Sequence, residues 1–395
     1  MAIVRKKRFK KKWPIYVCVG ILGMLCAGLS ILIYIKIAVN EPVVSVNQNE
    51  NVIYPTPYSD THITENAKTT DPQFKKLSSS GKESFLASVI SSFQTPVTPI
   101  TEEKQPEKGT WLWTPTLEMT PSYWNSIIAG AKENGIRNIY LSLDSYLDIF
   151  VLPDGAEKTA KQKTFDSILE KFIGAAHKNG MTVDAEAGWR NWAEQGNEYK
   201  AFAIIDYVLR FNSMHAEKFR GLQYDIEPYL LEEYAKDKAD VLYNFVSLVS
   251  ETTSRLKKSD LEFSVVIPDF YDKSSGETPK FFYGLRYEYT LTHLLNVLDR
   301  RPNSTLIVMA YRNFSKGTGG SIDISEEEIQ TANKYNTKVL VAQETGDFPP
   351  SYITFHHTSR SYMNAQIKNI EKAFANDKSY NGVAIHYANA LMELK

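Results

Sequence analysis

Three polar residues alternate along one apolar run near the middle of the sequence, namely Gln223, Asp225 and Glu227. Every second side chain of a β-strand points to the same side, so these three residues would share one face. Asp184 and Glu186 alternate in the same way within an earlier run. When carboxyl groups are crowded together, the pKa of one of them rises, and that group stays protonated as a proton donor. The spacing therefore indicates acid–base chemistry by paired carboxyl groups.

Aromatic, acidic and other polar side chains also follow the remaining short apolar runs of the chain. Hydrolysis of a glycosidic bond needs one carboxylic acid that protonates the leaving oxygen and a second group that stabilises the cationic sugar centre. Trp and Tyr add flat faces that suit the apolar side of a sugar ring. We therefore expect carbohydrate as the ligand, with binding residues Trp113, Asp144, Glu186, Trp189, Gln223, Tyr229, Asp269, Arg312, His386 and Tyr387.

Two of these residues also have a structural interpretation. Trp189 is as well suited to packing its loop onto the rim of the fold as to lining a sugar subsite. Arg312 would either bind the carboxylate of an acidic sugar or form a bidentate ion pair with Glu227 or Glu344. For Arg312 the ion pair is the favoured interpretation.

Eight short β-rich runs must position these residues, and longer amphipathic segments separate them. Thr120-Pro121 is typical of a helix start and Asn134-Gly135 of a helix end, and an apolar stripe over 165–173 predicts a second helix that ends at 179–180. The expected strands are 110–114, 136–143, 182–187, 221–226, 262–267, 305–310, 338–342 and 382–386. Further helices are expected at 197–217, 230–257, 287–299, 324–335 and 360–375.

This alternation over residues 109–395 has the strand count and the size of a (β/α)8 TIM barrel, an α/β fold. The alternative is an open doubly wound sheet, which usually carries a Gly-rich phosphate loop after its first strand. Here Trp113-Thr114-Pro115-Thr116 stands at that place. In a barrel, catalytic residues lie at the carboxyl ends of the strands, so the side chains named above are expected to converge there.

The N-terminal segment predicts a membrane anchor. Residues 1–12 contain seven Lys or Arg residues, and 13–35 contain no charged residue. A helix of that length spans about 35 Å, enough to cross a hydrocarbon core of ~30 Å. The basic residues predict a cytoplasmic tail at 1–12, a single transmembrane helix at 13–35 in contact with the lipid bilayer, and an extracytoplasmic main body. A cleaved signal peptide is the alternative, but its apolar region is normally shorter. Residues 36–108, rich in Asn, Ser, Thr and Pro, are expected to form a stalk.

Charge and cysteine content exclude several classes of function. Residues 1–40 hold eight of the 45 basic residues and none of the 46 acidic ones, so the remaining chain carries a net charge of −9. An acidic body argues against nucleic acid as a partner. Both cysteines lie in the predicted membrane segment, which excludes a disulfide framework or thiolate metal site in the body. His356, His357 and His386 have no metal-ligand spacing with nearby acids and are expected on loops or the rim, so no metal or cofactor is implied.

The segment 221–227 resembles the barrel-type glycoside hydrolases of the chitinase-like family 18. That family ends its fourth strand in Asp-x-Asp-x-Glu, and Asp225 and Glu227 match its last two positions, whereas Gln223 replaces the first Asp. The run Val308-Met309-Ala310-Tyr311 is similar to the family's Met-x-Tyr signature. The resemblance implies that Glu227 is the acid and that Asp225 and Tyr311 hold the reacting N-acetyl group of the substrate. The family's strand-8 Trp is replaced here by Ile385-His386-Tyr387.

The chain also resembles the large retaining clan of glycoside hydrolases, which places one Glu after strand 4 and another after strand 7. Glu227-Pro228 is similar to the end of its Asn-Glu-Pro motif, with Ile226 in place of Asn, and 339–346 is similar to its nucleophile segment. This resemblance implies that Glu227 is the acid/base and Glu344 the nucleophile, about 5–5.5 Å apart. The body is similar as well to uncharacterised hydrolase-like barrels of bacterial surfaces.

These observations predict a membrane-anchored, extracytoplasmic glycoside hydrolase that acts on an envelope or extracellular polysaccharide. The expected catalytic residues are Glu227, Asp225, Glu344 and Tyr311. A catalytically inactive glycan-binding or scaffold protein on the same barrel is the alternative, favoured by the departures from both motifs. A membrane-tethered protein-interaction module is a third interpretation, and it predicts no affinity for sugars.

Overall fold

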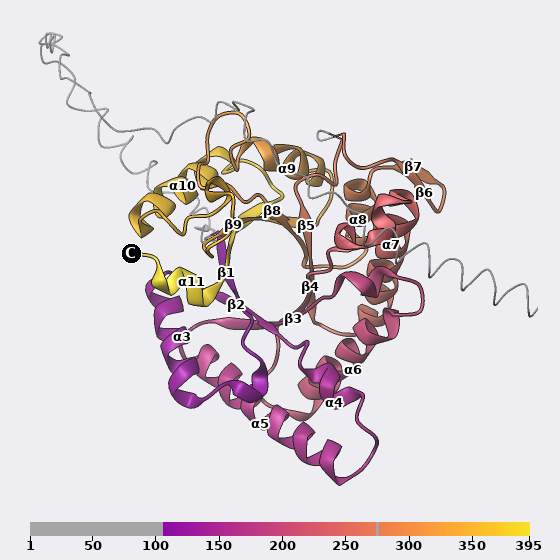
Figure 1. Cartoon of the computed structure of the whole chain (residues 1–395), viewed down its shortest axis with the longest axis vertical. Coiled ribbons are helices and arrows are strands. Elements are labelled where there is room, and N and C mark those ends of the chain that lie inside the picture. The colour runs from indigo at the N-terminus through magenta and orange to yellow at the C-terminus, as the bar shows by residue number, and fades with distance from the viewer. Residues whose placement is uncertain (1–105, 274–275) are drawn as a thin grey trace, which may run out of the picture. The chain divides into compact units, whose positions relative to one another are not determined.

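Eight parallel strands form a closed barrel in the computed structural model of the chain, which describes residues 106–273 and 276–395. The strands follow one another around the barrel in the order β1, β2, β3, β4, β5, β8, β9 and β10, and β10 pairs with β1. The helices lie around the outside of this ring (Figure 1). The predicted (β/α)8 barrel is therefore confirmed.

The strands coincide closely with the eight predicted runs. β1 begins at Glu107, two residues before the predicted start of the body, because Glu107 and Lys108 pair with Gly382 and Val383 of β10. The barrel strands are β1 (Glu107–Leu112), β2 (Asn138–Ser142), β3 (Thr182–Ala187), β4 (Gly221–Tyr224), β5 (Glu262–Pro268), β8 (Ser304–Met309), β9 (Lys338–Glu344) and β10 (Tyr380–His386).

Nine α-helices lie in the part of the chain that the structure describes. They are α3 (Pro121–Glu133), α4 (Tyr146–Phe150), α5 (Ala156–Lys178), α6 (Glu198–Met214), α7 (Lys238–Arg255), α8 (Thr290–Leu298), α9 (Glu326–Ala332), α10 (Arg360–Ala373) and α11 (Ala388–Glu393). The Thr120 side chain caps α3 by accepting the Tyr123 N–H, and Pro121 occupies the first helical position, as the sequence predicts.

Two features differ from the predicted elements. The expected helix over 230–257 is interrupted, because short 3-10 turns at Pro228–Leu230 and Glu232–Ala235 precede α7 and Asp237 caps the new helix start. A small antiparallel hairpin, β6 (Phe281–Tyr283) with β7 (Arg286–Glu288), was not predicted and lies beside α7 and α8 (Figure 1). Strands of three residues leave too short a pattern for periodicity to reveal them.

The predicted tail at 1–12, the transmembrane helix at 13–35 and the stalk up to residue 105 lie outside the described residues. Within residues 106–273 and 276–395, none of the helices combines the length and the apolar character needed to cross a bilayer.

Large side chains fill the inside of the barrel. Trp111, Tyr140, Val266, Ile307 and Leu340 form a buried cluster within the ring of strands. Outside the ring, the apolar faces of the helices pack on the strands in a second and larger core. The barrel is therefore a packed scaffold with its polar groups left for the two ends.

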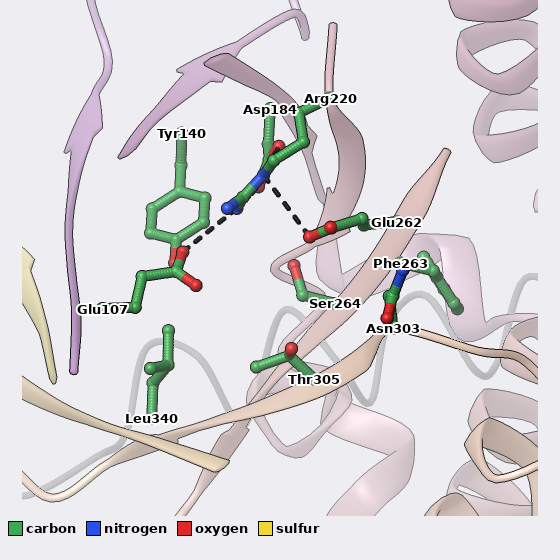
Figure 2. A pocket seen from close by; sticks show the side chains of 10 residues that line it. All are labelled: Glu107, Tyr140, Asp184, Arg220, Glu262, Phe263, Ser264, Asn303, Thr305 and Leu340. Carbon is green, nitrogen blue, oxygen red and sulfur yellow. Dashed lines mark hydrogen bonds and ion pairs between the residues drawn. The ribbon is translucent and has the colours of Figure 1, made fainter. Parts of the chain in front are cut away.

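An ion-pair network fills the amino-terminal end of the barrel. The Arg220 guanidinium contacts Asp184 at 2.6 Å, Glu107 at 3.1 Å and Glu262 at 3.4 Å (Figure 2). The cavity beside these groups measures about 10 Å³, room for about one water molecule. Asp184 therefore does not join Glu186 at the carboxyl end: it lies two residues earlier on β3 and belongs to this network.

Candidate active site at the carboxyl ends of the strands

Asp225 and Glu227 follow β4 directly, at the carboxyl end of the barrel. The Asp225 N–H donates to the Ala187 carbonyl at 3.2 Å, which extends the pairing of β3 and β4 by one residue. Gly188 makes this approach possible, since a Cβ there would lie 1.9 Å from the Asp225 carbonyl oxygen. The backbone therefore holds Asp225 firmly against the end of β3.

Four carboxyl groups from three consecutive strands gather around this point. Asp144 follows β2 and accepts the Gly188 N–H at 3.2 Å, and Glu186 is buried near the end of β3. Asp225 and Glu227 follow β4. The negative charges of Asp144 and Asp225 act on Glu186, and those of Glu227 and Asp144 act on Asp225. The predicted convergence of acids from these strands is therefore present in the fold.

Burial and mutual repulsion change the charge of this group. Burial, with the neighbouring charges of Glu227 and Asp144, raises the pKa of Asp225 from 3.8 to about 8. Burial likewise raises the pKa of Asp144 to about 7, although the Gly188 N–H opposes the shift. The pKa of Glu186 is raised well above its usual range, first by burial and then by Asp144 and Asp225. At neutral pH the group holds protons beside Glu227.

Glu227 is half-buried and has one oxygen engaged. The Tyr229 hydroxyl donates a hydrogen bond to its Oε1. The Tyr229 ring is itself fixed, because it packs edge-on against Phe270 at 5.2 Å and Tyr271 at 6.4 Å. This contact orients the Glu227 carboxyl group and leaves Oε2 for another partner.

Tyr311 links the acids of β4 with that of β9. It follows β8 and is partly buried against the interior cluster of the barrel. Burial raises the pKa of its hydroxyl well above the usual range, and the charges of Glu344, Asp225 and Glu227 add to the shift. Acids from the ends of β4 and β9 therefore act on one phenol group at the end of β8.

Glu344, the last residue of β9, has hydrogen bonds on both carboxylate oxygens. Oε1 accepts the Gly346 N–H at 2.6 Å, and Oε2 lies 2.6 Å from His386 Nδ1. Trp113 Nε1–H donates to the other ring nitrogen, His386 Nε2, at 3.0 Å. Since Nε2 accepts, the imidazole proton must lie on Nδ1 and point at Glu344. Glu344 is 4% exposed, and both of its side-chain oxygens accept hydrogen bonds.

An aromatic wall surrounds His386. Its ring lies 5.6 Å from Trp113, 6.1 Å from Tyr311 and 5.1 Å from Tyr387, between ring centroids. The predicted ligand-binding residues Trp113, His386 and Tyr387 are thus brought together at the ends of β1 and β10. Phe348, 6.5 Å from the His386 ring, completes the group and was not singled out in the sequence.

The other predicted binding residues are distributed differently. Gln223 is fully buried below Asp225, and its Oε1 accepts the Trp111 indole N–H at 2.6 Å, so any effect on a ligand would be indirect. Arg312 lies 3.7 Å from Asp269, both half-buried, and it pairs with this acid instead of with Glu227 or Glu344. Trp189 is 52% exposed just before a 3-10 turn on the rim.

The histidine pair differs from the expectation. His356 and His357 lie on a loop, as predicted, but both imidazoles come close to Asp347, a residue nine and ten positions earlier that spacing alone did not connect with them. Their ligand atoms lie within 4.8 Å of one another, whereas the spacing in the sequence indicated no such group. His386, in contrast, belongs to the aromatic wall described above.

Comparison with known proteins finds similarity at the level of the fold. No protein-family model matches the sequence, and no curated protein is similar enough to count as a relative. The structure is similar to an endo-1,4-β-D-mannanase from Thermotoga petrophila, with a TM-score of 0.50 and 12% identity over 71% of this chain and 88% of that one. A family 18 chitinase from Pseudoalteromonas aurantia gives a TM-score of 0.44 and 15% identity over 73% and 98% of the two chains. At these identities only the barrel fold is shared.

Proposed function

We propose that the chain is a glycoside hydrolase that cleaves an N-acetylated glycan with assistance from the substrate's own N-acetyl group. The observation that carries this proposal is the placement of Asp225, Glu227 and Tyr311 together at the carboxyl end of the barrel. Active sites of TIM-barrel enzymes lie at this end.

Glu227 is the general acid. Its Oε1 accepts a hydrogen bond from the Tyr229 hydroxyl, so Oε2 is left to face the glycosidic oxygen and to pass it a proton taken from the neighbouring Asp225. Asp225, with its pKa raised to about 8, keeps that proton at neutral pH. Proton donation by a positioned carboxylic acid contributes about 10²–10⁴ to a reaction rate.

The second catalytic group is the substrate's acetamido oxygen, which attacks the anomeric carbon as the Glu227 proton is transferred and the glycosidic bond breaks. Asp225 orients the acetamido N–H, and the Tyr311 hydroxyl supports the carbonyl. Water then opens the cyclic intermediate, and Glu227, now a carboxylate, takes its proton. Glu344 is less suited to act as the nucleophile, since it is buried and both of its oxygens accept hydrogen bonds.

A non-catalytic glycan-binding protein is the second candidate. It is favoured by Gln223, whose amide replaces an ionisable carboxyl beneath Asp225 and is tied to the Trp111 indole. A protein of this kind would bind the same sugars across the wall formed by Trp113, His386 and Tyr387 without cleaving them.

The protein is proposed to act outside the cell membrane. The uncharged stretch 13–35, the basic residues that precede it and the polar stretch 36–108 support an anchor with the barrel held away from the bilayer on a stalk. The substrate would then be a polysaccharide of the envelope or the surroundings.

The test compares oligosaccharides with and without N-acetyl groups as substrates for the wild type, Glu227→Gln and Glu344→Gln. We expect cleavage of the N-acetylated series only. Glu227→Gln should lower turnover by about 10²–10⁴ and keep the affinity for the glycan. Glu344→Gln should cost at most about thirtyfold, since it alters two hydrogen bonds worth ~1 kcal/mol each and leaves the proton donor in place.

Glu233→Gln is the matched control, because Glu233 is an exposed glutamate in the turn that follows. It should retain wild-type turnover. Binding without cleavage by the wild type would support the non-catalytic candidate. Equal loss of turnover in Glu227→Gln and Glu344→Gln would instead support a two-glutamate mechanism.

A further inference from the structure

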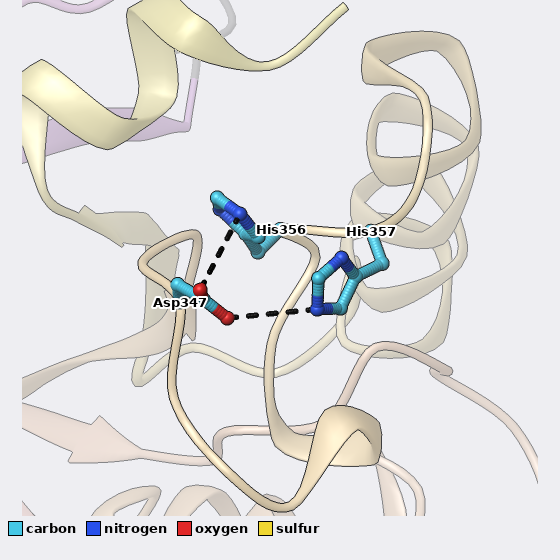
Figure 3. Close-up of side chains that lie close together, drawn as sticks. All are labelled: Asp347, His356 and His357. Carbon is cyan, nitrogen blue, oxygen red and sulfur yellow. Dashed lines mark ion pairs between the residues drawn. The ribbon is translucent and has the colours of Figure 1, made fainter.

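A second group of chemically active side chains lies on the loop after β9. One ligand atom from each of Asp347, His356 and His357 lies within 4.8 Å of the others. In Figure 3 the Asp347 carboxylate lies between the two imidazoles, with one oxygen directed to each. We propose that these three residues bind a divalent transition-metal ion of the zinc type.

The distances between the groups favour a shared metal ion over direct hydrogen bonds. His356 Nε2 lies 3.9 Å from Asp347 Oδ2, and His357 Nε2 lies 3.5 Å from Asp347 Oδ1. A direct N–H···O hydrogen bond would need about 2.7–3.2 Å. In a tetrahedral zinc site with bonds of about 2.1 Å, neighbouring ligand atoms lie about 3.4 Å apart. The separations are therefore close to those of ligands around one ion.

The backbone of this loop is already fixed on both sides of the three residues. Gly346, directly before Asp347, donates its N–H to Glu344 Oε1 at 2.6 Å. Phe355, directly before His356, donates its N–H to the Glu344 carbonyl at 2.8 Å. The Thr354 hydroxyl joins the two segments by donating to the Gly346 carbonyl at 2.5 Å. The ligand residues are thus brought together by bonds that do not involve their own side chains.

The ligand types select the class of metal. Two imidazoles and one carboxylate suit zinc and its neighbours, whereas calcium and magnesium prefer oxygen ligands alone. Three protein ligands leave a coordination position for water or a ligand group. The side chains of Asp347 and His357 are 72% and 64% exposed, so an ion has free access.

The expected consequence of metal binding is a stiffer loop beside Glu344. Asp347 follows the residue whose N–H holds the Glu344 carboxylate, and an ion that joins Asp347 to the two histidines would close a ring across residues 347–357. The proposal does not depend on the proposed hydrolase activity and is tested without a glycan.

The test measures metal binding by the full chain, purified with a tag that lacks histidine and freed of metal with a chelator. Zn²⁺ binding is measured by isothermal titration calorimetry. In a parallel sample Co²⁺ replaces Zn²⁺, and its visible absorption bands show whether the ion is bound in a low-symmetry site. We expect one ion per chain. We expect a weaker affinity for Zn²⁺ in each of Asp347→Asn, His356→Asn and His357→Asn. The loss should be at least about tenfold, because changing even a residue that only supports a metal ligand costs about tenfold to a hundredfold.

His177→Asn is the matched control, since His177 on α5 pairs with Glu217 in the loop after α6 and its replacement should leave the affinity unchanged. Far-ultraviolet circular dichroism checks that every variant is folded. Slower amide exchange over 345–358 with Zn²⁺ would add independent support. A full chain that binds no Zn²⁺, or a triple variant that binds it with wild-type affinity, would overturn the proposal.

Discussion

The proton on Asp225 couples the candidate site to the stability of the protein. Its pKa rises from 3.8 to about 8 on folding, because burial and the charges of Glu227 and Asp144 disfavour the carboxylate. The folded chain therefore keeps a proton that the unfolded chain releases between these two values. The linked stabilisation is fully present below about pH 4 and is lost as the pH rises to about 8.

Asp225→Asn should remove this dependence, because a neutral amide has no proton to lose. Relative to the wild type, we expect the variant to gain stability as the pH increases. The Tm of Asp225→Asn minus the Tm of the wild type should increase by at least about 2 °C from about pH 5 to about pH 8, the change that ~1 kcal/mol produces in a domain of this size. Thermal unfolding followed by circular dichroism measures it.

Asp154→Asn serves as the control, since that side chain is 97% exposed and should show no such change with pH. A difference in Tm between Asp225→Asn and the wild type that stays constant from about pH 5 to about pH 8 would contradict the raised pKa.

At the residue scale, the sequence identified the reactive side chains better than their partners. Asp225 and Glu227 could be predicted because alternation along a strand places them on one face. The contacts of Tyr229 with Glu227 and of Gly346 with Glu344 depend on turn geometry just after each strand. Arg312 pairs with Asp269 because the ends of β8 and β5 lie side by side in the barrel. A local sequence pattern carries no information on which strand ends become neighbours.

The contact between the ends of β3 and β4 is the structural element on which the acid pair depends. Gly188 permits the Asp225 backbone to approach, and its own N–H holds Asp144. Gly188→Ala should push the two strand ends apart. We expect a loss of about 1–3 kcal/mol in the free energy of unfolding, the cost of overpacking a tight contact, together with reduced turnover. Chemical denaturation measures the first quantity.

Gly155→Ala is the matched control, because a Cβ at Gly155 meets no atom within 4 Å. It should leave both stability and turnover close to the wild type. Equal stability of the two variants would show that the contact with Asp225 is not tight in solution.

At the scale of elements, periodicity and capping residues predicted most of the barrel. The eight strands were found because buried parallel strands form short β-rich runs between helices. The split of the helix before α7 escaped prediction, since Asp237 begins a new helix within a continuous apolar pattern. The hairpin of β6 and β7 escaped it because each strand is only three residues long and Phe281 is its one buried hydrophobic residue, too little for a periodic pattern.

The chain as a whole combines the barrel with a basic and apolar N-terminal segment. We expect the full chain to sediment with membranes and to resist alkaline extraction, because an uncharged helix over 13–35 would span the bilayer. A chain without residues 1–35 should be recovered in the soluble fraction with the same glycan-cleaving activity. Cell fractionation and immunoblotting measure this, and a full chain that is soluble or released by alkali would contradict the anchor.

The proposed hydrolysis requires Glu227 to act on a sugar bound at the carboxyl end of the barrel. The most direct measurement is a crystal structure of Glu227→Gln with an N-acetylated oligosaccharide. We predict a glycosidic oxygen within about 2.6–3.2 Å of the residue 227 side chain, with the acetamido group between Asp225 and Tyr311. An oligosaccharide bound elsewhere, or one whose bonds all lie beyond reach of residue 227, would contradict the account.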